Sequence, residues 1–270
     1  MSAETPSSQR YPGGTQFADP SILTAAEWVA NATALVVFTG AGVSTESGIP
    51  DFRGPQGIWK KIDPSIFEFS RYVRDPEIRK LSWRMRLEHG AFEARPNPSH
   101  YAIAELEKLT SFEALITQNI DGLHHAAGST PEKIYEIHGT MKQVKCLDCG
   151  RRWPTEVILE RVTKGQEDPS CTSCGGILKT ATISFGEQLE SHTLDKCQEA
   201  AVRSDVFLVA GSSLVVYPAA ALPQIARDTG AKLLIFNLEE TPLDSEADLV
   251  FRGKTGELLP RLVEAVKSVQ

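Results

Sequence analysis

Four short runs of almost uninterrupted apolar residues constrain the fold of this chain more than any other feature. Strands of a parallel sheet that helices cover on both faces have this continuous character, whereas a strand with one solvated face alternates apolar and polar residues. The runs therefore predict four buried parallel strands. They span Ala34–Thr39, Phe112–Thr117, Asp205–Ala210 and Lys232–Asn237.

Helical patterns lie between and after these runs. Asn97-Pro98 offers a capping residue and a first-turn proline ahead of a segment whose apolar residues recur on one face. A final helix is predicted to open at Thr255, because Leu258 and Leu262 begin a helical repeat there. Alternating strands and helices imply right-handed crossovers and predict an α/β, doubly wound, Rossmann-like parallel sheet.

Two stretches interrupt this alternation and divide the chain. Residues 55–96 are rich in arginine, aromatic residues and proline, and predict an insertion of loops and short helices. Residues 140–181 hold two cysteine pairs and predict a small zinc-binding module. Residues 1–20, with their serine, proline and glycine, predict a flexible tail. The Rossmann-like domain is then assigned to residues 21–54, 97–139 and 182–270.

Composition narrows the class of protein. The 270 residues are 41% hydrophobic, which suffices for a sizeable core and excludes global disorder. No apolar run approaches the roughly 20 residues of a membrane helix, and the start has no apolar signal segment. The net charge of −7 disfavours binding to phosphate-rich surfaces. We therefore expect a cytoplasmic protein that binds neither membranes nor nucleic acid directly.

The cysteines carry the clearest metal signal. Cys146-x2-Cys149 and Cys171-x2-Cys174 are separated by 21 residues, and four thiolates complete a tetrahedral zinc shell at about 2.3 Å. An all-sulfur shell favours a closed structural site over a catalytic one, which keeps a position for water. A redox role for the pairs is the weaker alternative. The remaining Cys197 is predicted to be a small buried apolar residue of a helix.

A glycine turn follows the first predicted strand. Gly40 and Gly42 permit a tight turn and close approach of the backbone to a pyrophosphate at a helix N-terminus. Thr45 stands where the usual dinucleotide pattern has its third glycine, so a plain strand–helix turn remains an alternative. The loop Asp51-Phe52-Arg53 that follows combines an acid, an aromatic ring and a guanidinium. This trio favours a loop that covers a cofactor.

Polar residues also follow the second predicted strand. Gln118–Asp121 lie at its carboxyl end, where open α/β sheets bind ligands, although a solvated loop is the alternative. His138 follows a short strand-like run, and an imidazole is the natural proton acceptor near neutral pH. We interpret His89, His100 and His192 as surface or core residues, and expect His124 or His125 to lie beside the pocket.

Four ordered segments resemble those of one enzyme family. GAGVSTESGIPDFRG is similar to the cofactor-binding segment of sirtuins, and TQNIDGLH, His138-Gly139 and Gly211-Ser212-Ser213-Leu214 follow in the family's order. The resemblance covers roughly residues 25–268. It implies an NAD-dependent protein-lysine deacylase (deacetylase) with NAD as co-substrate, one structural Zn²⁺ and acyl-lysine proteins or peptides as partners. Its products would be nicotinamide, free lysine and O-acyl-ADP-ribose.

The resemblance also implies roles for individual residues. Asp121 would hold the nicotinamide carboxamide, Asn119 a ribose or an ordered water, and Gln118 the ribose hydroxyls. His138 and Asn119 would be the catalytic residues. The implied NAD contacts are Gly40, Ala41, Gly42, Ser44, Asp51, Phe52, Arg53, Gln118, Asn119, Ile120, Asp121, Gly211, Ser212, Ser213, Asn237, Leu238, Glu239 and Thr255.

The substrate side follows from two further segments. In sirtuins a strand that ends in Phe-Gly-Glu pairs with the substrate backbone, and a second edge faces it. These edges would be Phe185, Gly186 and Glu187 on one side and Leu214, Val215 and Val216 on the other. The chain departs from the family at Lys179–Ser184, where many members have a proline and a Val-Val pair. It also lacks a tyrosine in LSWRMRLEHG, where desuccinylating members carry Tyr-x-x-Arg.

The implied mechanism begins when the acyl carbonyl oxygen attacks C1′ of the NAD ribose and nicotinamide leaves. His138 then deprotonates a ribose hydroxyl, which attacks the resulting imidate, and water completes the release of lysine. NAD-dependent protein ADP-ribosylation uses the same pocket and remains an alternative. A non-catalytic NAD-sensing module is an alternative of another class, and a dehydrogenase is disfavoured because the third glycine is absent.

Overall fold

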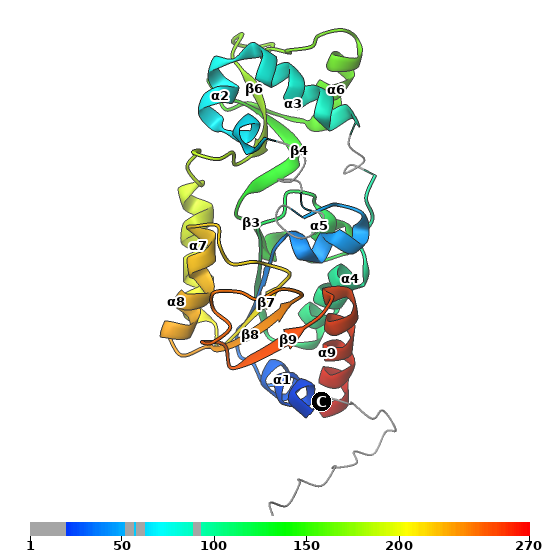
Figure 1. Ribbon diagram of the computed structural model, residues 1–270, viewed down its shortest axis with the longest axis vertical. Helices are drawn as coiled ribbons and strands as arrows, with labels where there is room; N and C mark the ends of the chain where they lie inside the picture. Colours follow the sequence, from blue (N-terminus) through cyan, green and yellow to red (C-terminus); the bar gives the residue numbers. More distant parts are fainter. Residues whose placement is uncertain (1–19, 52–56, 58–62, 89–92) are drawn as a thin grey trace, which may run out of the picture.

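The computed structural model describes residues 20–51, 57, 63–88 and 93–270. Its centre is a six-stranded parallel sheet in the order β3-β2-β1-β7-β8-β9 (Figure 1). The predicted runs form β2 and β8 without change, and β1 and β7 begin one residue later than predicted. The strands are β1 (Leu35–Thr39), β2 (Phe112–Thr117), β3 (Ile134–Glu136), β7 (Val206–Ala210), β8 (Lys232–Asn237) and β9 (Leu249–Arg252).

Helices cover both faces of this sheet, as the continuous apolar runs predict. Alternate residues of β1 feed two separate cores: Leu35 and Val37 face one core, whereas Val36 and Phe38 face the other. The doubly wound α/β prediction is therefore confirmed (Figure 1). One face carries α1 (Pro20–Ala30), α4 (Pro98–Leu109) and α9 (Thr255–Val269), and the other carries α7 (Ser191–Arg203) and α8 (Leu222–Asp228).

The predicted start of α4 has a local cause. The side chain of Asn97 accepts a hydrogen bond of 2.9 Å from the backbone N–H of Ser99, and Pro98 occupies the first turn of α4. The ring of His100 completes the capping box from the other side. The last helix, α9, begins at Thr255 as predicted. No helix among the described residues is long and apolar enough to cross a membrane.

A smaller unit lies at one end of the molecule (Figure 1). It contains an antiparallel sheet with the strand order β5 (Arg152–Pro154), β4 (Gly139–Cys146) and β6 (Leu178–Thr182). The helix α6 (Thr155–Thr163) follows β5 in the chain. The helical insertion supplies α2 (Phe69–Arg74) and α3 (Pro76–Glu88). Trp83 of α3 shares a core with Val144 and Ile158, so the two insertions pack as one body.

Candidate active site

The turns that follow β1 and β7 meet at the carboxyl edge of the large sheet. The N–H of Gly40 donates to the carbonyl of Ala210 at 3.1 Å, and Gly42 donates to Gly211 at 2.8 Å. A Cβ at Gly40 would lie 2.7 Å from the carbonyl oxygen of Gly211, and a Cβ at Gly42 would lie 2.7 Å from its Cα. Glycine is therefore required at both positions because the turn after β1 contacts the turn after β7.

The turn after β1 runs into a short 3₁₀ helix, η1 (Ala41–Ser47), and brings Ser44 into a buried polar network. The hydroxyl of Ser44 donates to Asp121 Oδ2 at 2.7 Å, and the backbone N–H of Leu123 donates to Asp121 Oδ1 at 2.8 Å. Asn119 Nδ2 donates to the carbonyl of Gly40 and to Ser44 Oγ, both at 3.1 Å. The structure thus joins predicted residues from two distant segments in one network.

His100 belongs to the same network, which sequence reasoning missed. Its Nε2 lies 3.5 Å from Ser44 Oγ, and its Nδ1 accepts the backbone N–H of Asn97 at 3.3 Å. Burial lowers the pKa of His100 to about 4, against a smaller opposite effect of Asp121. The imidazole is therefore neutral near pH 7 and holds its proton on Nε2. No local signal marked this residue, since its role depends on how α4 lies against η1.

His124 is linked by hydrogen bonds to the start of the loop Asn119–Asp121. The helix α5 (Leu123–Ala126) places its ring in the interior, with Nε2 3.0 Å from Thr39 Oγ1. Thr39 donates to Thr117 Oγ1 at 2.8 Å, and Thr117 Oγ1 accepts the backbone N–H of Asn119 at 3.1 Å. Burial keeps the pKa of His124 well below its usual value. This chain of hydrogen bonds fixes the start of the Asn119–Asp121 loop.

His138 follows β3 at the same edge of the sheet. Its Nδ1 lies 3.2 Å from the carbonyl oxygen of Gln118, which can only accept, so Nδ1 carries the proton and Nε2 is left as an acceptor. Burial lowers the pKa of His138, and the bond to Gln118 acts in the opposite direction. Gln118 is itself held, because its Nε2 donates to Ser212 Oγ at 2.8 Å. The geometry suits a general base near neutral pH.

The remaining predicted NAD residues differ in their surroundings. Asn237 ends β8, and its Nδ2 donates to the carbonyl of Glu239 at 2.7 Å, which leaves Leu238 exposed between them. The hydroxyl of Thr255 does not face this loop, since it lies 2.8 Å from Ser99 Oγ in the interior. Residues Ala41, Ile120 and Ser213 are half-buried in the turns that carry them, as is Asp51. Phe52 and Arg53 lie outside the described residues, and so does His89.

The four cysteines form a compact cluster in the small unit. Their Sγ atoms all lie within 4.8 Å of one another, with 3.5 Å between Cys146 and Cys174 and 3.7 Å between Cys149 and Cys171. These separations are far beyond a disulfide and match a tetrahedron of sulfurs at about 2.3 Å from one zinc ion. The described residues thus offer the four-thiolate site that the spacing predicts. Cys197 is fully buried in α7, as predicted.

The substrate side differs from the predicted extended strand. The strand β6 ends at Thr182. Beyond it the chain turns at Gly186 (φ 77°), and the N–H of Glu187 donates to the carbonyl of Ser184 at 3.0 Å. Both main-chain groups of Phe185 are engaged with the helical insertion, through the carbonyl of Phe67 and the N–H of Phe69. The strand β6 thus ends before Phe-Gly-Glu and not in it as predicted; an isolated bridge between Phe185 and Glu68 and a turn at Gly186 follow instead.

Two main-chain positions remain open for an added strand. Within the described part of the chain, the N–H and carbonyl of Gly186 and of Val215 make no hydrogen bond, whereas the carbonyl of Val216 accepts the N–H of Ala220. The side chains of Phe185 and Val215 are 43% and 44% exposed. Leu214, in contrast, is buried, so it contributes to the wall and not to the surface.

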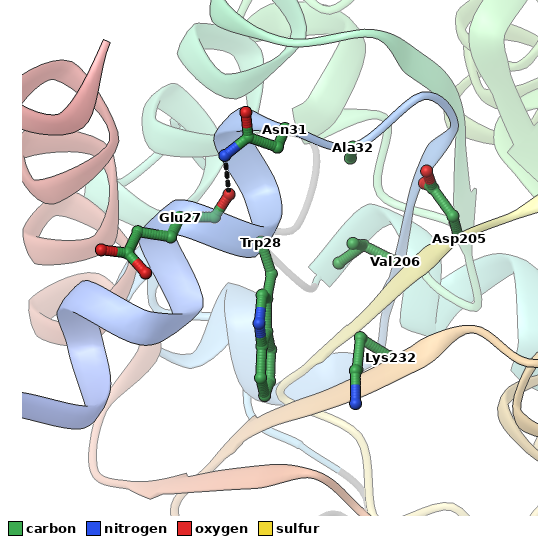
Figure 2. Close-up of a pocket in the computed structure, with 7 residues that line it drawn as sticks. All are labelled: Glu27, Trp28, Asn31, Ala32, Asp205, Val206 and Lys232. Atoms are coloured by element: carbon green, nitrogen blue, oxygen red, sulfur yellow. Dashed lines mark hydrogen bonds between the residues drawn. The ribbon is translucent and has the colours of Figure 1, made fainter.

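A separate hollow of about 350 Å³ lies at the opposite, amino end of the sheet, beside Trp28 (Figure 2). Its polar groups are engaged by the protein itself: Asp205 accepts the N–H of Thr33 and of Ala34, and Lys232 pairs with Asp248 at 2.9 Å. Ligands of open parallel sheets bind at the carboxyl ends of the strands, so this hollow is not the active site.

Known proteins are similar to this chain in sequence and in fold. The Sir2 family model matches residues 40–218. The chain is 43% identical over 235 residues to NAD-dependent protein deacetylase 2 of Streptomyces coelicolor, with 86% of this chain and 97% of that protein covered. It is 46% identical over 255 residues to NAD-dependent protein deacylase 2 of Archaeoglobus fulgidus, which covers 93% of this chain and 98% of that one.

Solved structures agree with these matches. One from work on the mechanism and regulation of Sir2 enzymes superposes with a TM-score of 0.83 at 46% identity, over 92% of this chain and 98% of its own. A complex of Sir2 with a p53 peptide and NAD⁺ gives a TM-score of 0.80 at 36% identity, over 88% and 95% of the two chains. The chain belongs to the Sir2 family, the sirtuins.

Proposed function

We propose that this protein is an NAD-dependent protein-lysine deacylase that acts on acetyl-lysine peptides. The observation that carries the proposal is the state of His138, whose Nδ1 is tied to the Gln118 carbonyl while Nε2 is left as an acceptor. Its pKa is lowered by burial, so the ring is a neutral base at physiological pH. A third solved Sir2 structure, at 37% identity, holds a deacetylated p53 peptide with 3′-O-acetyl ADP-ribose.

The residues at the sheet edge fit the co-substrate. Bound NAD supplies a ribose carbon that the acyl oxygen attacks as nicotinamide leaves. The glycine turn offers backbone close to a pyrophosphate, and Asp121, buried and held by Ser44, offers a fixed acceptor for a carboxamide N–H. His138 Nε2 then takes the proton of a ribose hydroxyl. Orientation and the exclusion of bulk water account for most of the rate enhancement.

The peptide would bind as an added strand between Gly186 and Val215. Main-chain hydrogen bonds then supply affinity, so selectivity for the flanking sequence is loose. The net charge of −7 favours basic peptides and disfavours nucleic acid and anionic membrane surfaces. We place the enzyme in the cytoplasm, where the four thiols of the zinc site stay reduced.

The test incubates purified protein with an acetyl-lysine peptide, with and without NAD, and follows nicotinamide release and peptide mass together. His138→Ala is the test variant. His192→Ala is the matched control, since His192 is exposed on α7. We expect NAD-dependent loss of the acetyl mass in wild type and in the control, and none in His138→Ala.

Other outcomes assign other functions. A gain of ADP-ribose mass on protein with nicotinamide release would identify a transferase. NAD binding without either product, repeated with longer acyl chains, would identify a non-catalytic NAD-sensing module.

A further inference from the structure

A lysine in β6, the strand that precedes the turn at Gly186, is almost completely buried. The side chain of Lys179, in β6, is 2% exposed. Buried lysines are rare unless they are paired, because an ammonium group loses its hydration. Lys179 lies directly across the β4–β6 ladder from Lys145, so both side chains project from the same face of the small sheet.

Both lysines converge on one carboxylate. Lys179 Nζ lies 2.8 Å from Glu187 Oε2, and Lys145 Nζ lies 3.2 Å from Glu187 Oε1. The side chain of Glu187 is 9% exposed, and Oε2 also accepts the backbone N–H of Ser184 at 3.0 Å. Burial lowers the pKa of Lys179 to about 8, although Glu187 opposes this effect. Lys179 also donates to the carbonyl of Thr182, so its ammonium group fixes two points of the chain.

The carboxylate belongs to the turn that carries the open substrate edge. Ser184–Glu187 contains Gly186, with its unpaired main-chain groups, and the half-exposed ring of Phe185. The residue before this segment is bonded to the proposed catalytic histidine: the N–H of Ile183 donates to the carbonyl of His138 at 2.8 Å. The turn is therefore attached to His138 at one end and to the zinc-binding sheet through Glu187 at the other.

We propose that Lys179 and Lys145 are positioning residues for the acyl-lysine peptide, which they serve by holding the turn Ser184–Glu187 through the carboxylate of Glu187. This inference rests on the proposed deacylase function. The inference goes beyond the deacylase function because it makes the small sheet, and not only the large one, responsible for peptide affinity. Neither lysine touches the NAD site, so the co-substrate is bound as before when one of them is changed.

The test variant is Lys179→Met, which keeps the apolar stem and removes the charge. We expect the KM for an acetyl-lysine peptide to rise about tenfold, equivalent to about 1.4 kcal/mol, while the KM for NAD stays unchanged. Lys164→Met is the matched control, since Lys164 lies in the same unit, is exposed and pairs with the exposed Glu160 at 2.6 Å. Zinc content and the melting temperature are recorded for each variant.

A merely structural role predicts a different result. Loss of zinc, or equal changes in both KM values, would overturn the proposal, as would an unchanged KM for the peptide. The Lys179→Met/Glu187→Gln double variant adds a second readout: its KM should be close to that of Lys179→Met alone, because the two groups act as one unit. Additive effects on the KM would contradict the proposal that Lys179 acts through Glu187.

A readout without turnover separates this inference from the proposed function. Amide hydrogen exchange at Ser184 and Glu187 should be faster in Lys179→Met than in wild type and unchanged in Lys164→Met. If wild type does not deacylate, the proposed function fails, and the exchange result still decides whether Lys179 holds the turn. Equal exchange in all three proteins would refute it.

Discussion

The hydroxyl of Ser44 donates a 2.7 Å hydrogen bond to the carboxylate of Asp121, across 77 positions of the chain. Removing it leaves a buried carboxylate with one donor fewer, which costs about 1–3 kcal/mol. We expect Ser44→Ala to raise the KM for NAD and to lower the melting temperature. Steady-state kinetics with varied NAD and thermal unfolding check both effects. Ser191→Ala, at an exposed position on α7, should match wild type.

The pH profile of activity should reflect His138. A base acts when it is neutral, and burial lowers the pKa of this ring below its usual value of 6.5. We therefore expect kcat/KM to fall only below pH 6.5 and to be flat from pH 7 to 8. Rates measured between pH 5 and 8, with stability confirmed at each pH, test this. A midpoint above 7 would contradict the assignment.

Glu136 should make stability depend on pH in the direction opposite to most carboxylates. Burial raises its pKa from 4.5 to about 7, against a hydrogen bond from Thr140. Between pH 4.5 and pH 7 the carboxyl of Glu136 holds its proton in the native state and loses it in the unfolded state. The free energy of unfolding that this group contributes is therefore lost as pH rises through 7. Ionising it costs on the order of 3 kcal/mol. Glu136→Gln should therefore gain stability over wild type at pH 8 and not at pH 4.

Urea unfolding at the two pH values measures this difference. Glu132→Gln is the matched control, because Glu132 is exposed in η5 (Pro131–Lys133) close by. An equal difference between Glu136→Gln and wild type at both pH values would show that Glu136 ionises normally.

The zinc site should be structural. Its four sulfurs leave no position for water, so we expect Cys171→Ser to lose bound zinc and to unfold the small unit while the large sheet persists. Zinc analysis and near-ultraviolet circular dichroism check this. Cys197→Ala, which changes the one cysteine outside the cluster, should keep full zinc content. Full zinc in Cys171→Ser would disprove the four-cysteine site.

Local patterns predicted the large sheet and the metal ligands well. The runs that form β2 and β8 have the predicted limits because both faces of each strand are buried, which the sequence records directly. Asn97-Pro98 predicted the start of α4 because the capping bond is made within three residues. The cysteine spacing predicted a site whose four ligands come from two short turns.

Contacts between distant segments could not be predicted in this way. His100 reads as an ordinary helix residue until α4 is laid against η1. A lysine such as Lys179 is expected at the surface. Its burial depends on the carboxylate of Glu187, which the following turn brings to it. The turn at Phe185 replaced a strand because residues 67–69 of the insertion take its main-chain bonds, and nothing local marks that partner.

The contact between Gly42 and Gly211 has a practical consequence for building hybrid enzymes. A Cβ at Gly211 would lie 2.5 Å from the nitrogen of Val43, and a Cβ at Gly42 would lie 2.7 Å from the Cα of Gly211. Neither turn could therefore pack against a turn of different backbone conformation taken from another protein. A segment that carries the β1 turn from a relative must travel together with its matching β7 turn. The smallest transferable part of this active site is therefore a pair of segments 169 positions apart, and not a contiguous cassette.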